Sequence, residues 1–331
     1  MGKTSKPSQI KRKARFNLMY AQNCAQATLL TLGSTVERSD PVLMRAATNF
    51  EGGCVGCGST CGVVSGGVLG IGALLSSLPQ QDPQQLEQDI YEASIAYRKW
   101  FEDRFGSSLC KERIETELGT LKEFLSYLFP GDKLVRCLNH IGEALVFASD
   151  EVSRSAEKRG LEPRFDKGVP GGPTEPHCAY TVFKALAARS GRQEDSVGWA
   201  CTGLGGGVAL SGAVCGGLLG AILGLGLEYG VDPESMGFGG IVKAFLVGHR
   251  NLFRHETLAK GTVEDLPKEA FARSRYLLDR FEKAFGSLNC KEITGREFAS
   301  PDELNAFLPE SKVCGEIFTW CEQEAAELMG P

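Results

Sequence analysis

The sequence predicts an all-α protein in which one helical unit occurs twice. The chain aligns with itself at a shift of 154 residues, so that NCAQATLLTL (23–32) falls on HCAYTVFKAL (177–186). Apolar residues recur at helical spacing over 84–105 and 268–285. Alternating β-branched runs between tight-turn dipeptides, which would indicate strands, are scarce. We therefore expect an internally duplicated helical domain.

The composition limits the class of protein. Of 331 residues, 36 are Lys or Arg and 41 are Asp or Glu, which gives a net charge of −5. A mildly acidic chain argues against a nucleic-acid partner, and 42% hydrophobic with 23% charged residues is typical of a soluble globular protein. No apolar export segment follows the basic N-terminus, so we expect a cytoplasmic protein with reduced thiols.

The elements follow in order along the chain. Residues 1–15 carry basic side chains and no acid, and we expect a solvated, frayed tail, with contact to an acidic partner as the alternative. The first repeat takes residues 16–165, a Pro/Gly-rich linker 166–173, and the second repeat 174–331. Beyond residue 215 the shift grows to 180, because the second repeat contains an insertion of 26 residues.

Each repeat contains one glycine-rich stretch without a charged residue, at 52–81 and 196–227. Glycines recur there at every fourth position, namely Gly58, Gly62, Gly66 and Gly70, and Gly212, Gly216, Gly220 and Gly224. On a helix this spacing forms one stripe that lets another backbone approach closely. We expect two buried helices related by a pseudo-twofold axis, lying against each other or each against its mate in a homodimer. A membrane span is the alternative for stretches of this length, although basic flanks are absent.

Four of the twelve cysteines recur in the same order in each half. They are Cys24, Cys61, Cys110 and Cys137 in the first repeat, and Cys178, Cys215, Cys290 and Cys314 in the second. Buried cysteines that only pack are one interpretation. Structural zinc is another, but it prefers close pairs of ligands, and the gaps in the first repeat are 37, 49 and 27 residues. An iron–sulfur site or a redox-active thiol group fits thiolates drawn from several helices best, and we predict that these eight cysteines bind the cofactor.

Cys54, Cys57 and Cys61 form a C-x2-C-x3-C run that only the first repeat contains, since Val208 and Ser211 replace the first two in the second. In a loop, this spacing allows three thiolates to converge on one cluster. Cys54 and Cys57 are therefore candidate additional ligands, and we expect the two sites to be unequal. The alternative is a metal-free thiol/disulfide oxidoreductase that uses these three cysteines.

The remaining candidates are less specific. Cys201 and Cys321 have no counterpart in the first repeat, and we assign them to packing or a secondary redox role. Thr174 is expected to cap the first helix of the second repeat, which would place Cys178 at its positive end. His177 and His140 are expected as surface or capping residues rather than ligands. The pattern C-x-x-C-H is absent, which excludes c-type haem attachment, and no catalytic residue can be assigned.

These pieces resemble a family of redox-active proteins named for the cysteine pattern C-GCAxxG-C-C, in two tandem copies. The matching segments are NCAQA at Cys24, HCAYT at Cys178, CGVVSG at Cys61, CGGLLG at Cys215, FGSxxCKE at Cys110 and Cys290, and the late Cys137 and Cys314. The chain is also similar to the cysteine-rich part of split-Soret cytochromes, without their haem motifs. That resemblance implies an α-helical domain with a non-haem iron–sulfur site, and redox chemistry without a named substrate.

The sequence as a whole thus predicts an iron–sulfur protein, of undetermined cluster type, that passes electrons to a redox partner protein. We expect no nucleic acid and no membrane among its partners. A non-catalytic metal-binding or membrane-associated structural protein is the alternative from a different class. If each repeat holds its own cluster, Cys61→Ala and Cys215→Ala should each remove a separate share of the iron.

Overall fold

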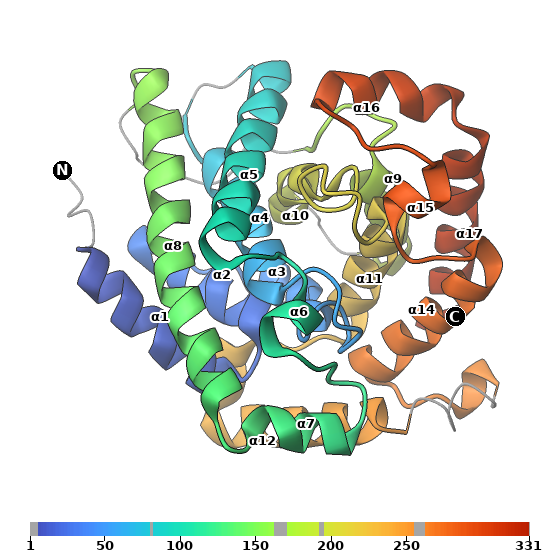
Figure 1. Ribbon diagram of the computed structural model, residues 1–331. Coiled ribbons are helices and arrows are strands. Elements are labelled where there is room, and N and C mark those ends of the chain that lie inside the picture. The colour runs from blue at the N-terminus through green and yellow to red at the C-terminus, as the bar shows by residue number, and fades with distance from the viewer. Residues whose placement is uncertain (1–5, 80–81, 162–170, 192–194, 255–261, 331) are drawn as a thin grey trace.

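The computed structural model describes residues 6–79, 82–161, 171–191, 195–254 and 262–330. These residues form helices, turns and two isolated β-bridges, and no strand occurs among them (Figure 1). The all-α prediction is therefore confirmed. None of the helices in the described part of the chain is long and apolar enough to cross a bilayer.

The elements of the first repeat recur in the same order in the second, which contains additional ones. The first repeat and the helix before it consist of α1 (Pro7–Ala21), α2 (Cys24–Thr35), α3 (Pro41–Ala46), η1 (Ala47–Phe50), α4 (Gly62–Leu75), α5 (Pro83–Phe105), α6 (Cys110–Ile114), α7 (Leu121–Leu128) and α8 (Asp132–Lys158). The second consists of α9 (Cys178–Ser190), α10 (Asp195–Gly198), η2 (Trp199–Leu204), α11 (Gly216–Tyr229), α12 (Pro233–Leu252), η3 (Val263–Asp265), α14 (Ala270–Phe285), α15 (Cys290–Thr294), α16 (Pro301–Phe307), η4 (Leu308–Glu310) and α17 (Lys312–Met329). Helix α12 contains most of the predicted insertion and has no counterpart in the first repeat.

Local sequence signals set the ends of the long helices. Helix α5 begins after Asp82, whose carboxylate accepts the N–H of Gln85, and Pro83 occupies its first position. It ends at Gly106, which has a φ of 89°, and α14 ends in the same way at Gly286. The helices predicted over 84–105 and 268–285 are thus confirmed.

The glycine-rich helices α4 and α11 are the buried centres of the two repeats. Their glycine stripes contact helices α2 and α9 of the same repeat. A Cβ on Gly66 would lie 2.7 Å from the carbonyl oxygen of Ala25, and one on Gly220 would lie 3.0 Å from the carbonyl carbon of Ala179. The stripe therefore serves packing within each repeat, whereas we had expected it to contact the other glycine helix or its mate in a homodimer. Gly58 and its equivalent Gly212 precede α4 and α11, respectively, and have a left-handed backbone conformation.

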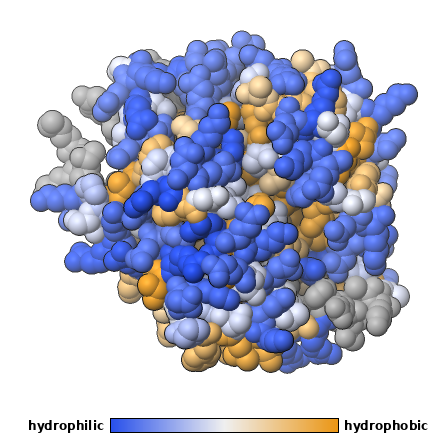
Figure 2. Space-filling view, viewed as in Figure 1, coloured by the Kyte–Doolittle hydropathy of each residue, from blue (hydrophilic) through white to orange (hydrophobic). Residues whose placement is uncertain are grey.

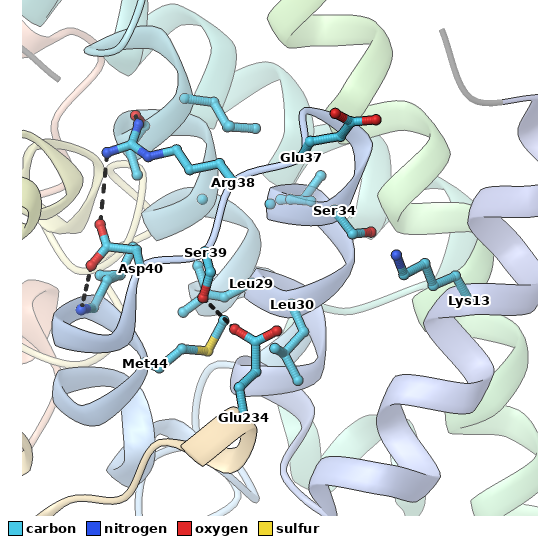
Figure 3. Close-up of a pocket in the computed structure, with 16 residues that line it drawn as sticks. Lys13, Leu29, Leu30, Ser34, Glu37, Arg38, Ser39, Asp40, Met44 and Glu234 are labelled. Carbon is cyan, nitrogen blue, oxygen red and sulfur yellow. Dashed lines mark hydrogen bonds and ion pairs between the residues drawn. The ribbon is translucent and has the colours of Figure 1, made fainter. Parts of the chain in front are cut away.

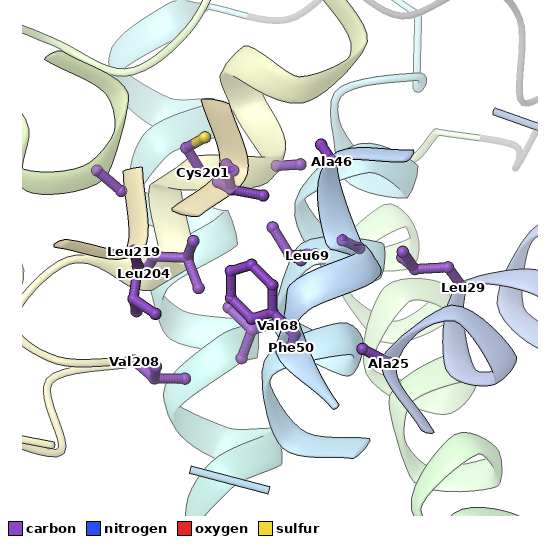
Figure 4. Packing of buried hydrophobic residues seen from close by; sticks show 14 of the residues in the cluster. Ala25, Leu29, Ala46, Phe50, Val68, Leu69, Cys201, Leu204, Val208 and Leu219 are labelled. Atoms are coloured by element: carbon purple, nitrogen blue, oxygen red, sulfur yellow. The ribbon is translucent and has the colours of Figure 1, made fainter. Parts of the chain in front are cut away.

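The two repeats exchange equivalent contacts near the ends of these helices. A Cβ on Gly72 of α4 would lie 2.9 Å from the Cα of Ala200, and one on Gly226 of α11 would lie 2.9 Å from the carbonyl carbon of Ala46. Both pairs are related by the shift of 154 residues, so the contacts are reciprocal, as a pseudo-twofold axis requires. Side chains of both repeats therefore share one core, which contains Phe50 of the first repeat and Leu204 of the second (Figure 4).

Two additions lie outside this symmetry. The basic segment forms the first turns of α1, because Ile10 and Ala14 are buried where α1 packs on α8, and the expectation of a frayed tail over 1–15 is wrong from Pro7 onward. Helix α12 packs on α14 and reaches α7 of the first repeat through the ring pair Phe124 and Phe245. Figure 1 places α7 and α12 together at the lower edge of the molecule. Of the predicted linker over 166–173, residues 166–170 lie outside the described residues.

Candidate functional site

The four repeated cysteines of the first repeat line one cavity of about 400 Å³. Cys24 is the first residue of α2, Cys61 directly precedes α4, Cys110 opens α6, and Cys137 lies in the second turn of α8. The fold thus brings together thiols that are far apart in the sequence, and three of the four stand where a helix begins.

A short antiparallel bridge joins two of these positions. The N–H of Cys61 donates to the carbonyl oxygen of Ser108 at 2.8 Å, and the N–H of Cys110 donates to that of Ser59 at 2.7 Å. The second repeat contains an equivalent bridge at the same two cysteine positions. This bridge holds the start of α4 against the start of α6, and it thereby sets the distance between the thiols of Cys61 and Cys110.

Backbone N–H groups point at the sulfur atoms. The Sγ of Cys61 accepts from Val63 and Val64 in the first turn of α4, and that of Cys24 accepts from Gly52. The equivalent residues donate to the two equivalent cysteines of the second repeat. Such bonds stabilise the thiolate and lower the thiol pKa. They are also the contacts that surround and tune metal-bound thiolates.

The loop that supplies Gly52 has a rare backbone conformation. Residues 52–56 all have positive φ, including Val55 at 53°, although β-branched residues seldom adopt it. In the second repeat, residues 206–210 form the same run, with Val208 and Ala209 at positive φ. Strain of this kind concentrates at functional sites, and here it directs the Gly52 N–H to the Cys24 thiol.

Glycine at the start of each buried helix makes room for a thiol. A Cβ on Gly62 would overlap the Sγ of Cys24 and lie 2.7 Å from the carbonyl oxygen of Phe50. A Cβ on Gly216 would lie 2.5 Å from the Cβ of Cys178. The glycine stripe therefore positions a cysteine of α2 or α9 against the buried helix, in addition to packing the two helices together.

The thiols of the first cavity are electrically neutral as long as nothing binds them. Burial, followed by the neighbouring thiols, raises the pKa of Cys61 to about 12 and that of Cys24 and Cys110 above the ordinary range. Burial also raises the pKa of Cys137 to about 11, opposed by a hydrogen bond from Tyr127. A cationic group that binds here must displace the protons, as thiolate ligands require.

The four repeated cysteines of the second repeat are arranged in the same way, but the space that they line is much smaller. Cys178, Cys215, Cys290 and Cys314 line a space of only about 10 Å³, together with apolar side chains that include Leu304. Burial raises the pKa of Cys215 to about 11 and that of Cys290 to about 12. In the described residues of both repeats, no group of three or more His, Cys, Asp or Glu is placed to hold a single metal ion.

The run Cys54, Cys57 and Cys61 divides between two places. Cys61 faces the cavity, whereas Cys54 and Cys57 are not among its lining residues. The Sγ of Cys57 accepts a hydrogen bond from Nη1 of Arg275 in α14 of the second repeat, at 2.9 Å. Burial raises the pKa of Cys57 to about 12, and the guanidinium of Arg275 opposes that rise.

The other two cysteines lie in the core. Cys201 in η2 is fully buried among apolar residues of both repeats (Figure 4). Cys321 in α17 is also buried, close enough to Cys215 for the two thiols to influence each other's charge. Both positions agree with the packing role expected for them.

The two histidines that neighbour repeated cysteines are buried and bonded within the protein. His177 is the N-cap of α9, and its Nδ1 accepts the N–H of Tyr180 at 3.2 Å. It takes the role that we expected for Thr174, so Cys178 does open the helix. The Nε2 of His140 lies 2.9 Å from Nη2 of Arg113.

Sequence reasoning missed the polar side chains that line the first cavity besides the cysteines, which are Gln22, Glu51 and Tyr127. Glu51 lines the cavity, and burial raises its pKa to about 8. Its Oε1 lies 3.6 Å from Nε2 of His249, whose pKa burial lowers to about 4. The only signal in the sequence was that Gly205 replaces Glu51 in the second repeat.

A further pocket of about 340 Å³ opens at the end of α2 (Figure 3). No cysteine is among its lining residues. Charged side chains such as Lys13, Glu37 and Asp40 surround it, and Ser39 donates to Glu234 across it. It is therefore separate from the thiol chemistry.

A protein-family model described as "Putative redox-active protein (C_GCAxxG_C_C)" matches residues 22–150 and again residues 176–328. The two matched regions coincide with the two structural repeats and contain all eight repeated cysteines. Neither the curated proteins nor the solved structures compared with the chain include a match.

Proposed function

Because the chain belongs to this family of redox-active proteins and contains two tandem copies of the region that defines it, we propose that it binds an iron–sulfur cluster and transfers electrons to a redox partner protein. The observation that carries the proposal is the convergence of Cys24, Cys61, Cys110 and Cys137 on one cavity. Cysteine thiolates in sets of four are the usual ligands of such clusters.

The residues of the first cavity fit the group. A cluster distributes its thiolates over several iron atoms, so the four sulfurs need not converge on one point. The N–H groups of Gly52, Val63 and Val64 supply the hydrogen bonds that such thiolates receive. The second set has the same donors but a space of only about 10 Å³, so it would have to open before it held a group of that size.

The chain's own residues would have three tasks. Cys24, Cys61, Cys110 and Cys137 would bind the cluster, which supplies one-electron redox chemistry when bound. The amide donors would stabilise the thiolates and favour the reduced, more negative state. The surrounding apolar side chains would keep water from the sulfurs, which disfavours the more negative state and so opposes the effect of the amide donors on the potential.

Iron analysis of the full chain, purified anaerobically, tests the proposal. We expect a coloured protein with iron and inorganic sulfide, and Cys61→Ala should lose most of both. Cys54→Ala is the matched control, because Cys54 lies in the same loop but outside the cavity, and it should retain them. A colourless protein with titratable thiols, or equal loss of iron in both variants, would contradict the assignment. Cys215→Ala measures the second site separately.

A second candidate function follows from the contact of Cys57 with Arg275. Here the Cys57 thiolate would attack the disulfide of a small disulfide compound, forming a mixed disulfide and releasing one thiol. Cys54 would then displace the second thiol, leaving a Cys54–Cys57 disulfide and two reduced thiols. This function requires no metal, and the loss of two titratable thiols on oxidation, prevented by Cys57→Ser, would support it.

A further inference from the structure

The first cavity has far more space than the equivalent one of the second repeat. Their volumes are about 400 Å³ and about 10 Å³, and sites for small molecules start at about 300 Å³. Part of the wall comes from α1 and α12, through Leu18 and Phe245. Neither helix has a duplicated copy among the described residues, so the extra space arises from elements outside the duplication.

The entrance to this cavity is apolar. Met19 and Leu246 line the cavity and yet are 52% and 61% exposed. Further exposed apolar side chains lie on α1, α7 and α12, including Phe16 and Leu125. The lower edge of the molecule in Figure 2 is correspondingly apolar where Figure 1 places α7 and α12. A charged or strongly hydrated molecule would lose its hydration here without compensation.

Besides the cysteines, three polar side chains line this otherwise apolar cavity, namely Gln22, Glu51 and Tyr127, and Glu51 is the one with a carboxyl group. The side chain of Glu51 is only 14% exposed, and its Oε1 lies 3.6 Å from Nε2 of His249. The thiols of Cys24 and Cys110 are the other ionisable groups close enough to interact with its charge. The Nδ1 of His249 lies 3.0 Å from the carbonyl oxygen of Phe245, and a carbonyl can only accept, so Nδ1 carries the proton. A separation of 3.6 Å is too long for a hydrogen bond, so the Glu51 carboxyl remains available to a molecule in the cavity.

We propose that the first cavity binds a neutral, apolar carbonyl compound of the quinone class, with Glu51 hydrogen-bonded to its carbonyl oxygen. This inference rests on the proposed electron-transfer function and names its substrate. In its reduced, hydroquinone form the compound is the electron donor, and its two electrons pass one at a time to the oxidised partner protein. The hydroquinone also gives up two protons, one to the Glu51 carboxylate and one to water at the entrance, and leaves as the quinone. Glu51 then releases its proton to solvent.

Binding of 1-tetralone to the full chain tests the site without any redox reaction, because this ketone neither oxidises thiols nor adds to them. Calorimetry on protein with and without its cofactor should give one site in both forms. Tetralin, which lacks the carbonyl, should bind about fivefold more weakly, the usual value of one hydrogen bond. Glu51→Leu should abolish this preference for the ketone, and Glu51→Gln, which can still donate, should keep it.

Leu134→Trp and Val135→Trp form a matched pair on α8. Leu134 lines the cavity, whereas Val135 is exposed and does not. Leu134→Trp should weaken 1-tetralone binding at least tenfold, and Val135→Trp should leave it unchanged. Equal effects of the two variants, or binding only to the cofactor-free chain, would overturn the inference. Failure to bind iron would refute the proposed function and leave a positive binding result standing, so the two outcomes remain distinct.

Discussion

The fit between Gly62 and the Cys24 thiol gives a quantitative prediction. In Gly62→Ala, the new Cβ would lie 2.7 Å from the backbone oxygen of Phe50 and would overlap the Cys24 sulfur. Overpacking of this kind costs about 1–3 kcal/mol, whereas alanine returns at most about 1 kcal/mol of helix preference. The free energy of unfolding should therefore fall by about 1–2 kcal/mol, and the displaced Cys24 should lower the iron content.

Urea denaturation and iron analysis measure the two effects. The matched control is Gly239→Ala in α12, because a Cβ there meets nothing within 4 Å and should be neutral or stabilising by up to about 1 kcal/mol. If Gly62→Ala is as stable as Gly239→Ala and keeps its iron, the glycine does not make room for the thiol, and the proposed link between glycine and cysteine fails.

Two further predictions concern charged groups near the cysteines. Burial raises the pKa of Glu51 from its ordinary 4.5 to about 8, so its contribution to stability is complete below about pH 4.5 and is lost as the pH rises through 8. The free energy of unfolding of the wild type should therefore fall between pH 5 and 9 by up to about 4 kcal/mol more than that of Glu51→Gln, and parallel urea-denaturation profiles would contradict this. Arg275→Met removes the cation that lowers the pKa of Cys57, so iodoacetamide should alkylate Cys57 more slowly at pH 9, whereas Arg280→Met on the same helix should not change the rate.

Much of the fold followed from the sequence because its signals are local or repeated. The spacing of apolar residues and the capping glycine gave α5 and α14 nearly to their ends. Self-alignment of the chain, at a shift of 154 residues that grows to about 180 beyond the insertion, predicted which cysteines occupy equivalent positions. Periodicity, however, identifies only which face of a helix is buried and not the neighbour that covers it. The glycine stripe was therefore assigned to the wrong neighbour, although its burial was predicted correctly.

The division of the C-x2-C-x3-C run could not be predicted for a different reason. Spacing alone allows Cys54, Cys57 and Cys61 to converge, but the loop adopts positive φ at Cys54 and Val55, and only Cys61 lines the cavity. That conformation is one which β-branched residues rarely adopt, so no propensity argument could have predicted it. The partner of Cys57 is a residue of the other repeat, more than 200 positions away.

The two cysteine sites differ mainly because of residues that lie outside the duplicated segments. Duplication supplies each site with the same thiols, amide donors and glycine contact, which is the part that self-alignment can detect. The cavity around the first set depends on α1 and α12, one before the repeats and one inserted in the second. Because α12, the insertion in the second repeat, forms part of the wall of the cavity in the first repeat, neither repeat alone would form this cavity. The two repeats thus build the first cavity together, and their asymmetry leaves about 400 Å³ beside one of two equivalent thiol sets and only about 10 Å³ beside the other.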